Sequence, residues 1–322
     1  MLQARGRGRR LLMPRLRLFD SDSWGWLLAV ASTVSFSLAT PLGKAAVVLD
    51  LNPSTLLVYR FAGTVLLMLL SLRLVAPEKI RIDRRGFWWT ALAGGANGLG
   101  SLSFFWSLTR IDASVATMIF SLNPLLILGL LALGGEQLTR RHLVRTVLGL
   151  AGAYLLLGPG VQVDPLGALL AAGCMVGFAI EVVIIQWYLR GYDSRTITLY
   201  VLFWMLVVNL LFACYQSAMG TLSWRFADPR SWLLLVVLIL VASYFAWWSM
   251  FSAITRIGGS QMALLMPIET LLSVTWSITL FDEALRREQL LGGALILGSA
   301  VLAAQRMTRV HWRPRWRAWP RR

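Results

Sequence analysis

Charged residues are scarce in this 322-residue sequence. They make up 14% of the chain, whereas 57% of the residues are hydrophobic. A soluble globular domain carries about 25% charged residues, so this composition excludes an ordinary soluble domain. Apolar stretches of about 20 residues recur along the whole chain, and each is long enough to cross a hydrocarbon core about 30 Å thick. The composition therefore predicts a polytopic α-helical membrane protein.

Residues that bind metals or form disulfides are also few. The two cysteines, Cys174 and Cys214, lie inside apolar stretches, which favours buried free thiols over a disulfide. The two histidines, His142 and His311, are remote from any cluster of cysteines or carboxylates. Because no metal-ligand spacing is present, we expect neither a metal site nor a cofactor.

Acidic residues are outnumbered by basic ones, and the formal net charge is +16. The basic residues lie in the tails, 1–23 and 306–322, and in short loops between apolar stretches, where the positive-inside effect places them. We therefore do not expect nucleic-acid binding. Both tails are rich in arginine, and tryptophans interleave with arginines in the second, so we expect the tails to contact anionic lipid headgroups.

Ten apolar stretches predict ten transmembrane helices. Their approximate ranges are 24–49, 55–76, 86–108, 113–134, 142–158, 165–189, 196–219, 231–254, 260–280 and 288–305. The connections between them are short, so no soluble domain is expected. The first stretch is too long for the apolar region of a cleavable signal peptide, and it lacks a cleavage signature.

The distribution of Lys and Arg predicts the orientation. With the N-terminus inside, 24 of the 31 basic residues fall in cytoplasmic segments and five fall in outer loops. This bias predicts a multi-pass protein of the cell inner (plasma) membrane with both termini in the cytoplasm.

The two halves of the chain, 24–158 and 165–305, resemble each other. In each half a span with an internal proline, Pro124 or Pro267, ends in a carboxylate and is followed by a glycine-bearing span. Because each half has five helices, an odd number, the second copy must be inverted in the membrane. The sequence thus predicts an all-α fold of two inverted five-helix repeats. This architecture recurs in transporters, with the substrate site near the midplane.

Several different short sequence motifs follow one another along the chain. They are Phe36 to Lys44, Asn52-Pro53 followed by Tyr59-Arg60-Phe61, Asn123-Pro124 followed by Gly135-Glu136-Gln137-Leu138-Thr139, and Glu269 to Glu283 followed by Gln289 and Gly292. Together they resemble the drug/metabolite transporter superfamily, specifically its EamA-type members with two tandem repeats. The resemblance covers about residues 24–305. It implies ten helices, a central cavity and export or exchange of small organic metabolites, amino acids among them.

The chain departs from that family pattern at four positions. Phe36 stands where a tryptophan is usual, Thr270 where a proline is frequent, Asp282 where a glycine precedes the glutamate, and Arg145 where a glycine is common. These departures leave the family assignment intact but give no guide to the substrate.

Four charged residues fall inside the expected spans: Lys44, Arg60, Glu181 and Glu269. A charge at a helix centre costs about 2.5–3.5 kcal/mol on insertion scales, so each needs a reason. Glu181 and Glu269 are expected at a similar depth, roughly 12–14 Å from the cytoplasmic boundary. Two such carboxylates suit proton coupling or recognition of an ammonium group. Alternatively, each is neutral or hydrogen-bonded and only locks helix packing.

The remaining charges are expected to be structural. Lys44 and Arg60 lie near the outer ends of their spans and are expected to extend to the interface. The functional alternative is a basic mouth that attracts carboxylates, or a brace on an outer gate. Glu136 is expected to cap or pair near the inner end of its span, with Arg140 or Arg141 as its partner.

Polar and aromatic residues on shared helix faces complete the candidate substrate site. Ser101 and Phe105 are four residues apart, as are Tyr244 and Trp248, so each pair shares a face. Aromatic walls with a few polar groups suit a small-molecule pocket, whereas contact with lipid is the alternative for the aromatics. The candidate substrate-binding set is Asn97, Ser101, Phe105, Asn123, Glu181, Tyr244, Trp248 and Glu269.

The leading hypothesis is a secondary transporter that exports or exchanges a small organic metabolite by alternating access, with an amino acid or related zwitterion as the favoured substrate. Proton-coupled efflux of lipophilic cations is the alternative, and protons are the candidate coupling ion. The chain has no Walker motif, which excludes an ATP-driven pump on this chain alone. It also lacks a cluster of His, Asp or Ser at the membrane edge, so an enzyme is not expected. A structural or lipid-scrambling protein would be favoured by a purely apolar cavity.

Overall fold

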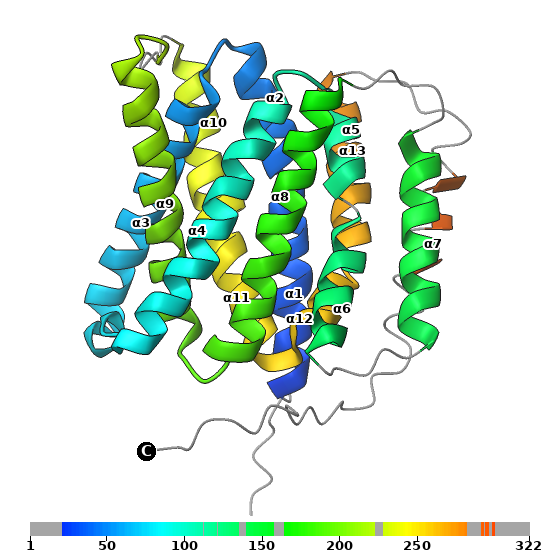
Figure 1. The fold of residues 1–322 in the computed structure, drawn as a ribbon, viewed down its shortest axis with the longest axis horizontal. Coiled ribbons are helices and arrows are strands. Elements are labelled where there is room, and N and C mark those ends of the chain that lie inside the picture. Colours follow the sequence, from blue (N-terminus) through cyan, green and yellow to red (C-terminus); the bar gives the residue numbers. More distant parts are fainter. Residues whose placement is uncertain are drawn as a thin grey trace, which may run out of the picture.

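The computed structural model describes residues 21–111, 113–120, 122–134, 140–157, 164–222 and 228–281, with 291–292, 294–295 and 298–299. All regular structure within these residues is helical (Figure 1). The expectation of an all-α protein is therefore confirmed for this part of the chain. The predicted roles of Glu136 and of the basic tails fall on residues outside it, apart from 21–23.

The helices of the first half follow the first five predicted spans. They are α1 (Ser21–Ser37) with α2 (Ala39–Val48), α3 (Pro53–Val75), α4 (Arg84–Ser107), α5 (Ala113–Phe120) with α6 (Asn123–Leu133), and α7 (Arg140–Leu157). A short 3-10 helix, η1 (Pro77–Ile80), lies between α3 and α4.

The helices of the second half follow the next four spans. They are α8 (Pro165–Ile184) with the π-helical turn η2 (Ile185–Leu189), α9 (Ser194–Ala218), α10 (Pro229–Ile239) with the π-helical segment η3 (Leu240–Phe245) and α11 (Ala246–Ile257), and α12 (Gly259–Ala263) with α13 (Met266–Phe281). The tenth predicted span, 288–305, lies largely outside the described residues. The structure therefore does not establish the predicted number of ten helices.

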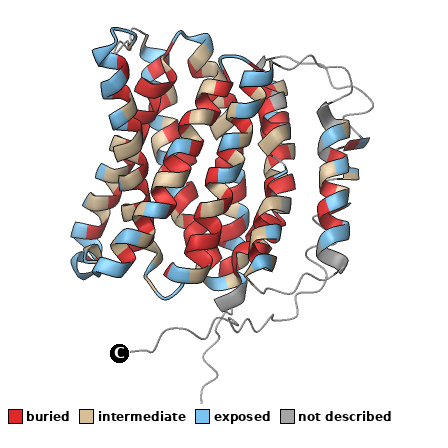
Figure 2. Cartoon of the chain, viewed as in Figure 1, coloured by how far each residue is buried: buried red, intermediate tan, exposed pale blue. Residues whose placement is uncertain are grey.

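Six helical segments of the described chain are long and apolar enough to cross a membrane by length and composition. They are Ser23–Val48, Pro53–Val75, Pro165–Leu189, Ser194–Ala218, Pro229–Ile257 and Gly259–Leu280. About half of the residues in the most apolar part of each segment are buried inside the bundle (Figure 2). The other half lie toward the outside of the bundle, where lipid would contact them. Helix α4 is not among the six, because its glycines, serines and Asn97 lower its mean hydropathy.

Asx-proline pairs begin three of the long helices. The side chains of Asn52, Asp164 and Asp228 each accept a hydrogen bond from the backbone N–H two residues later, and each is followed by proline at the first helical position. A capping side chain satisfies one free N–H group of the helix start, and proline there loses no intrahelical bond. These pairs explain why predicted and observed boundaries agree within a few residues.

The most extensive helix contacts cross between the two halves of the sequence. Helix α4 packs against α8 and α9, α1 against α11, and α3 against α9. Glycine permits the closest of these approaches: a Cβ atom on Gly177 of α8 would lie 2.4 Å from the carbonyl oxygen of Ala96 on α4, and one on Gly94 would lie 2.4 Å from that of Val201 on α9. Such close backbone contacts are typical of helix packing in lipid.

Helices α1 and α8 run in opposite directions. Helix α2, which continues α1, ends beside the end of α4, where Lys44 Nζ donates to the carbonyl oxygens of Leu108 (3.0 Å) and Ile111 (3.3 Å). Helix α8 begins at that same end, because Asp164 pairs with Arg110 across 3.2 Å. We call the end of the bundle where α1 begins the α1 end, and the opposite end the α8 end.

One contact is repeated at both ends of the bundle. Near the start of α1, a Cβ atom on Gly25 would lie 2.6 Å from Ile257 and 3.1 Å from Cβ of Arg256. Near the start of α8, a Cβ atom on Gly167 would lie at the same two distances from Ile111 and Cβ of Arg110. The first helix of each half is thus packed in the same way against the third span of the other half.

A polar latch ties the connection between α3 and α4 to the start of α9 at the α1 end. Lys79 Nζ pairs with Asp193 at 2.7 Å, and the Thr196 hydroxyl donates to the carbonyl oxygen of Lys79 at 2.6 Å. The Tyr192 hydroxyl donates to the Asp83 carboxylate at 2.6 Å. These bonds join segments from the two halves of the chain.

The latch is expected to weaken in acid. The hydrogen bond from Tyr192 lowers the pKa of Asp83, assisted by the Gly86 N–H and partly opposed by burial. A carboxylate with a lowered pKa stabilises the fold above its unfolded pKa of about 3.9, and this stabilisation is lost as the pH falls through the folded value. We expect Tyr192→Phe to cost less than about 1 kcal/mol at pH 7, because Asp83 is largely exposed. Thermal unfolding in detergent should show a wild-type advantage at pH 7 that declines as the pH falls below about 4; an advantage independent of pH would contradict this account.

Candidate functional site

A buried carboxylate on α8 is the centre of the candidate site. Glu181 is fully buried, and its Oε2 accepts a hydrogen bond of 2.9 Å from Nδ2 of Asn97 on α4. Its Oε1 has no hydrogen-bond partner among the residues that the structure describes. The close packing of α4 on α8 brings these two side chains together. Both were predicted as substrate-binding residues, and the structure joins them directly.

The fourth span of the first half is broken beside α8. Helix α5 ends at Phe120, and α6 begins at Asn123, immediately before Pro124. Proline cannot donate the hydrogen bond that would continue the helix through this point. Asn123 is fully buried and donates from Nδ2 to the carbonyl oxygen of Met175 on α8 at 3.1 Å, while its Oδ1 has no partner in the described part of the chain.

The fourth span of the second half is broken at the corresponding place. Helix α12 ends at Ala263, and α13 begins at Met266, immediately before Pro267. Glu269 follows in the first turn of α13, where the helix dipole favours a negative charge. It is half-buried, and no hydrogen bond to its carboxylate is found within the described residues.

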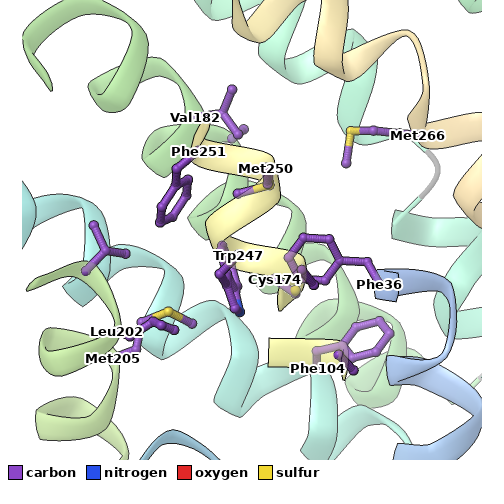
Figure 3. Packing of buried hydrophobic residues seen from close by; sticks show 14 of the residues in the cluster. Phe36, Phe104, Cys174, Val182, Leu202, Met205, Trp247, Met250, Phe251 and Met266 are labelled. Atoms are coloured by element: carbon purple, nitrogen blue, oxygen red, sulfur yellow. The ribbon is translucent and has the colours of Figure 1, made fainter. Parts of the chain in front are cut away.

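Aromatic rings from four helices meet beside this segment of α8. Phe178, three residues before Glu181, contacts Phe120 at a centroid distance of 5.5 Å and Trp247 of α11 at 6.2 Å. Trp247 in turn meets Phe36 of α1 edge to face at 5.0 Å. Figure 3 shows Trp247, Phe36 and Cys174 within this buried packing. We call Asn97, Asn123, Phe178, Glu181 and Trp247 the α8 site.

The α8 site holds three buried polar atoms that lack a partner within the described ranges. They are Oε1 of Glu181, Oδ1 of Asn123 and Nε1 of Trp247, so both acceptors and a donor are present. An unpaired buried polar group costs about 1–3 kcal/mol, and each such group calls for an explanation.

Arg60 lies in the bundle interior, contrary to the expectation that it extends to the interface. It is 4% exposed; its Nε donates to the Ser243 hydroxyl, and its Nη2 donates to the carbonyl oxygen of Ala242 at 2.8 Å. The guanidinium also lies over the rings of Phe61 and Phe105, 5.6 and 5.5 Å from their centroids. The π-helical geometry of η3 frees carbonyl oxygens for such a contact, which explains why the side chain turns inward. Lys44, by contrast, braces α2 against the end of α4, as described above.

The other predicted residues have varied surroundings. Ser101 donates its hydroxyl to the carbonyl oxygen of Gly98 in its own helix. Tyr244 and Trp248 pack against a second apolar cluster, formed by Met68, Leu72, Ala76 and Leu199. Their role in substrate binding stays a prediction.

Four aromatic residues of the α8 site and its surroundings were not in the predicted set: Phe36, Phe120, Phe178 and Trp247. Trp247 and Trp248 are adjacent in a long apolar span, and periodicity alone does not show which one faces the interior. The spacing of Phe178 to Glu181, three residues apart on one helix face, was a usable signal.

Comparison with known proteins agrees with this architecture. The sequence profile described as the EamA-like transporter family matches residues 23–158 and again residues 165–305. No curated protein sequence matches the chain. A crystal structure described only as that of a protein is similar, with a TM-score of 0.71 and 22% sequence identity over 87% of this chain and 96% of the other. At that identity the similarity concerns the fold alone.

Proposed function

This chain belongs to the EamA-like transporter family, as two tandem copies, and from that premise we propose that it is a secondary transporter of an amino acid or related zwitterion. Family membership makes it a membrane transporter of small solutes and confirms the resemblance seen in the sequence. The substrate class, the route and the coupling are the proposed part. We propose alternating access through a central cavity, with export or exchange as the direction of use.

One observation carries the substrate class. The fully buried Glu181 keeps one oxygen without a partner, within a site that otherwise consists of amide groups and aromatic rings. A carboxylate of this kind can receive an ammonium group, and the rings of Phe178 and Trp247 suit an apolar side chain. Asn123 Oδ1 offers a second acceptor, and Trp247 Nε1 offers a donor. Glu269, at the start of α13, is the second carboxylate of the proposed route.

The proposed topology is ten helices in two inverted repeats, 24–158 and 165–305, in the cell inner membrane with both termini cytoplasmic. The α1 end is then the cytoplasmic end. The opposite directions of α1 and α8, the equivalent packing of Gly25 and Gly167, and the two helix breaks before proline support this arrangement. Broken helices at the repeat interface are where transporters of this kind bind their substrates.

Efflux of lipophilic cations is a second candidate function. The ring of Phe178, one helical turn before the buried Glu181, contacts the ring of Trp247, which in turn contacts Phe36, and aromatic faces attract organic cations. The two candidates differ in one respect: a zwitterion also carries a carboxylate, which a lipophilic cation lacks.

Flux measurements on purified protein in proteoliposomes would test the proposal. We expect the wild type to carry at least one labelled amino acid faster than protein-free vesicles do, and faster than it carries tetraphenylphosphonium. If protons are coupled, an imposed pH gradient should drive accumulation, and Glu269→Gln should reduce that accumulation several-fold because it removes a titratable carboxylate. Flux of the cation alone would support the second candidate. Absence of flux for every compound, from folded protein, would contradict the proposed substrate class.

A further inference from the structure

Arg60 carries a buried charge that no carboxylate of the described residues balances. Its guanidinium is almost fully enclosed, and its two hydrogen bonds go to neutral acceptors, the Ser243 hydroxyl and the Ala242 carbonyl oxygen. No acidic side chain lies within ion-pairing distance of it in the described part of the chain. A buried cation without a counter-ion is costly, and charges in membrane helices mark substrate and ion pathways.

The guanidinium also has hydrogen-bonding capacity left over. An arginine has five N–H donors in a planar fork, and the two bonds from Nε and Nη2 use two of them. The remaining donors have no acceptor among the described residues. The aromatic faces of Phe61 and Phe105 shield the cation from water but accept no conventional hydrogen bond. A planar carboxylate is the ligand that such a fork binds best, through two parallel bonds.

Arg60 and Glu181 occupy different levels of the bundle. The separation of their levels can be measured along helix α4, because the ring of Phe105 lies against the Arg60 guanidinium and the Asn97 side chain donates a hydrogen bond to Glu181. Eight residues separate Phe105 from Asn97, which corresponds to about 12 Å along the helix axis. Phe105 is nearer the end of α4, so Arg60 lies toward the α8 end. An α-amino acid carries its ammonium and carboxylate on one carbon, so it cannot contact both side chains at once.

We propose that Arg60 forms a second substrate-binding site on the transport route, which binds the carboxylate of the substrate and which we call the outer station. This inference rests on the proposed function, in which Glu181 receives the ammonium group. The two stations are used in turn, Glu181 on the side of the α1 end and Arg60 on the side of the α8 end. A bound carboxylate occupies the free N–H groups of Arg60 and neutralises its charge. The requirement for that carboxylate distinguishes a zwitterion from an amine of the same shape.

A pair of substrates that differ only in the carboxylate would test this station. We would measure uptake of labelled phenylalanine and of 2-phenylethylamine into proteoliposomes with wild-type protein, Arg60→Gln and Arg60→Lys. We expect Arg60→Gln to reduce phenylalanine uptake about tenfold and to change amine uptake by less than about twofold, with Arg60→Lys intermediate because it keeps the charge without the fork. The matched control is Arg110→Gln, which removes an exposed positive charge at the same end of the bundle.

The outcomes separate this inference from the proposed function. If the wild type carries no labelled amino acid at all, the substrate class itself is contradicted, and this inference with it; if it carries others but not phenylalanine, the outer station as tested here is refuted while the substrate class stands. If the wild type carries phenylalanine but Arg60→Gln slows both compounds equally, or slows neither, Arg60 only packs helices and the outer station is refuted. A measurement on wild-type protein covers the case in which Arg60→Gln does not fold. There, 3-phenylpropionate, which has the carboxylate but no ammonium, should compete with phenylalanine uptake, and a lack of competition would refute the station.

Discussion

Replacing Glu181 by glutamine is expected to reduce substrate flux by at least about tenfold while leaving the protein folded. Glutamine has nearly the same shape, and its carbonyl oxygen can still accept the hydrogen bond from Asn97 that ties α8 to α4. What is lost is the carboxylate whose unpaired oxygen receives the ammonium group of the substrate in the proposed function. Removing one partner of a desolvated charge contact costs about 2–5 kcal/mol, which exceeds the 1.4 kcal/mol that corresponds to a tenfold effect.

The measurement is initial uptake into proteoliposomes, normalised to protein that elutes as a single species in size-exclusion chromatography. Glu78→Gln is a suitable control, because it makes the same chemical change at an exposed position in the connection between α3 and α4. Flux through Glu181→Gln within about twofold of the wild-type value would mean that Glu181 only joins helices, which is the structural alternative.

Replacing Gly177 by valine is expected to abolish folding, and Gly177→Ala to lower the melting temperature strongly. Any Cβ atom at this position would lie 2.4 Å from the carbonyl oxygen of Ala96 and 3.2 Å from Cα of Gly100. Both obstacles are backbone atoms, so no side-chain rotation can relieve the overlap. Forcing α4 and α8 apart would also break the bond between Asn97 and Glu181. Overpacking of this kind costs about 1–3 kcal/mol for small insertions, and a branched side chain adds to that.

Gly95→Ala is the matched control for this prediction. Gly95 is in α4, one residue from Ala96, but a Cβ atom there would meet nothing within 4 Å. In a helix interior alanine is favoured over glycine by about 1 kcal/mol, so this variant should be neutral or slightly stabilised. Thermal unfolding of detergent-solubilised protein would compare the two. If Gly177→Ala melts at the same temperature as Gly95→Ala, the close approach of α4 and α8 is not as described.

The positions of the spans could be predicted because their signals are local. The capping pairs that begin at Asn52, Asp164 and Asp228 fix helix starts within the chain segment itself. Apolar length and the family motifs need no knowledge of tertiary packing either. The pairing of Asn97 with Glu181 was within reach for a related reason: polar side chains in apolar spans are few, and each needs a partner.

Local signals could not predict which aromatic and basic side chains face the interior of the bundle. In a span that is apolar on all sides, hydrophobic periodicity does not separate the interior face from the lipid face, so it did not distinguish Trp247 from Trp248. The Arg60 side chain points into the bundle, where it bonds to the π-helical segment η3. Its acceptor there, the carbonyl oxygen of Ala242, belongs to a residue 182 positions later in the sequence. Such long-range contacts leave no local trace in the sequence.

The contacts that cross between α1 and α11, and between α4 and α8, also bear on how the protein is made. Each copy of the repeat is a unit of sequence, yet its main packing partners belong to the other copy. During synthesis, the surface of α1 that packs against α11 therefore stays uncovered until most of the chain has been inserted into the bilayer. Assembly of this bundle is therefore a late event, because the first copy lacks its main packing partners until the second has been made.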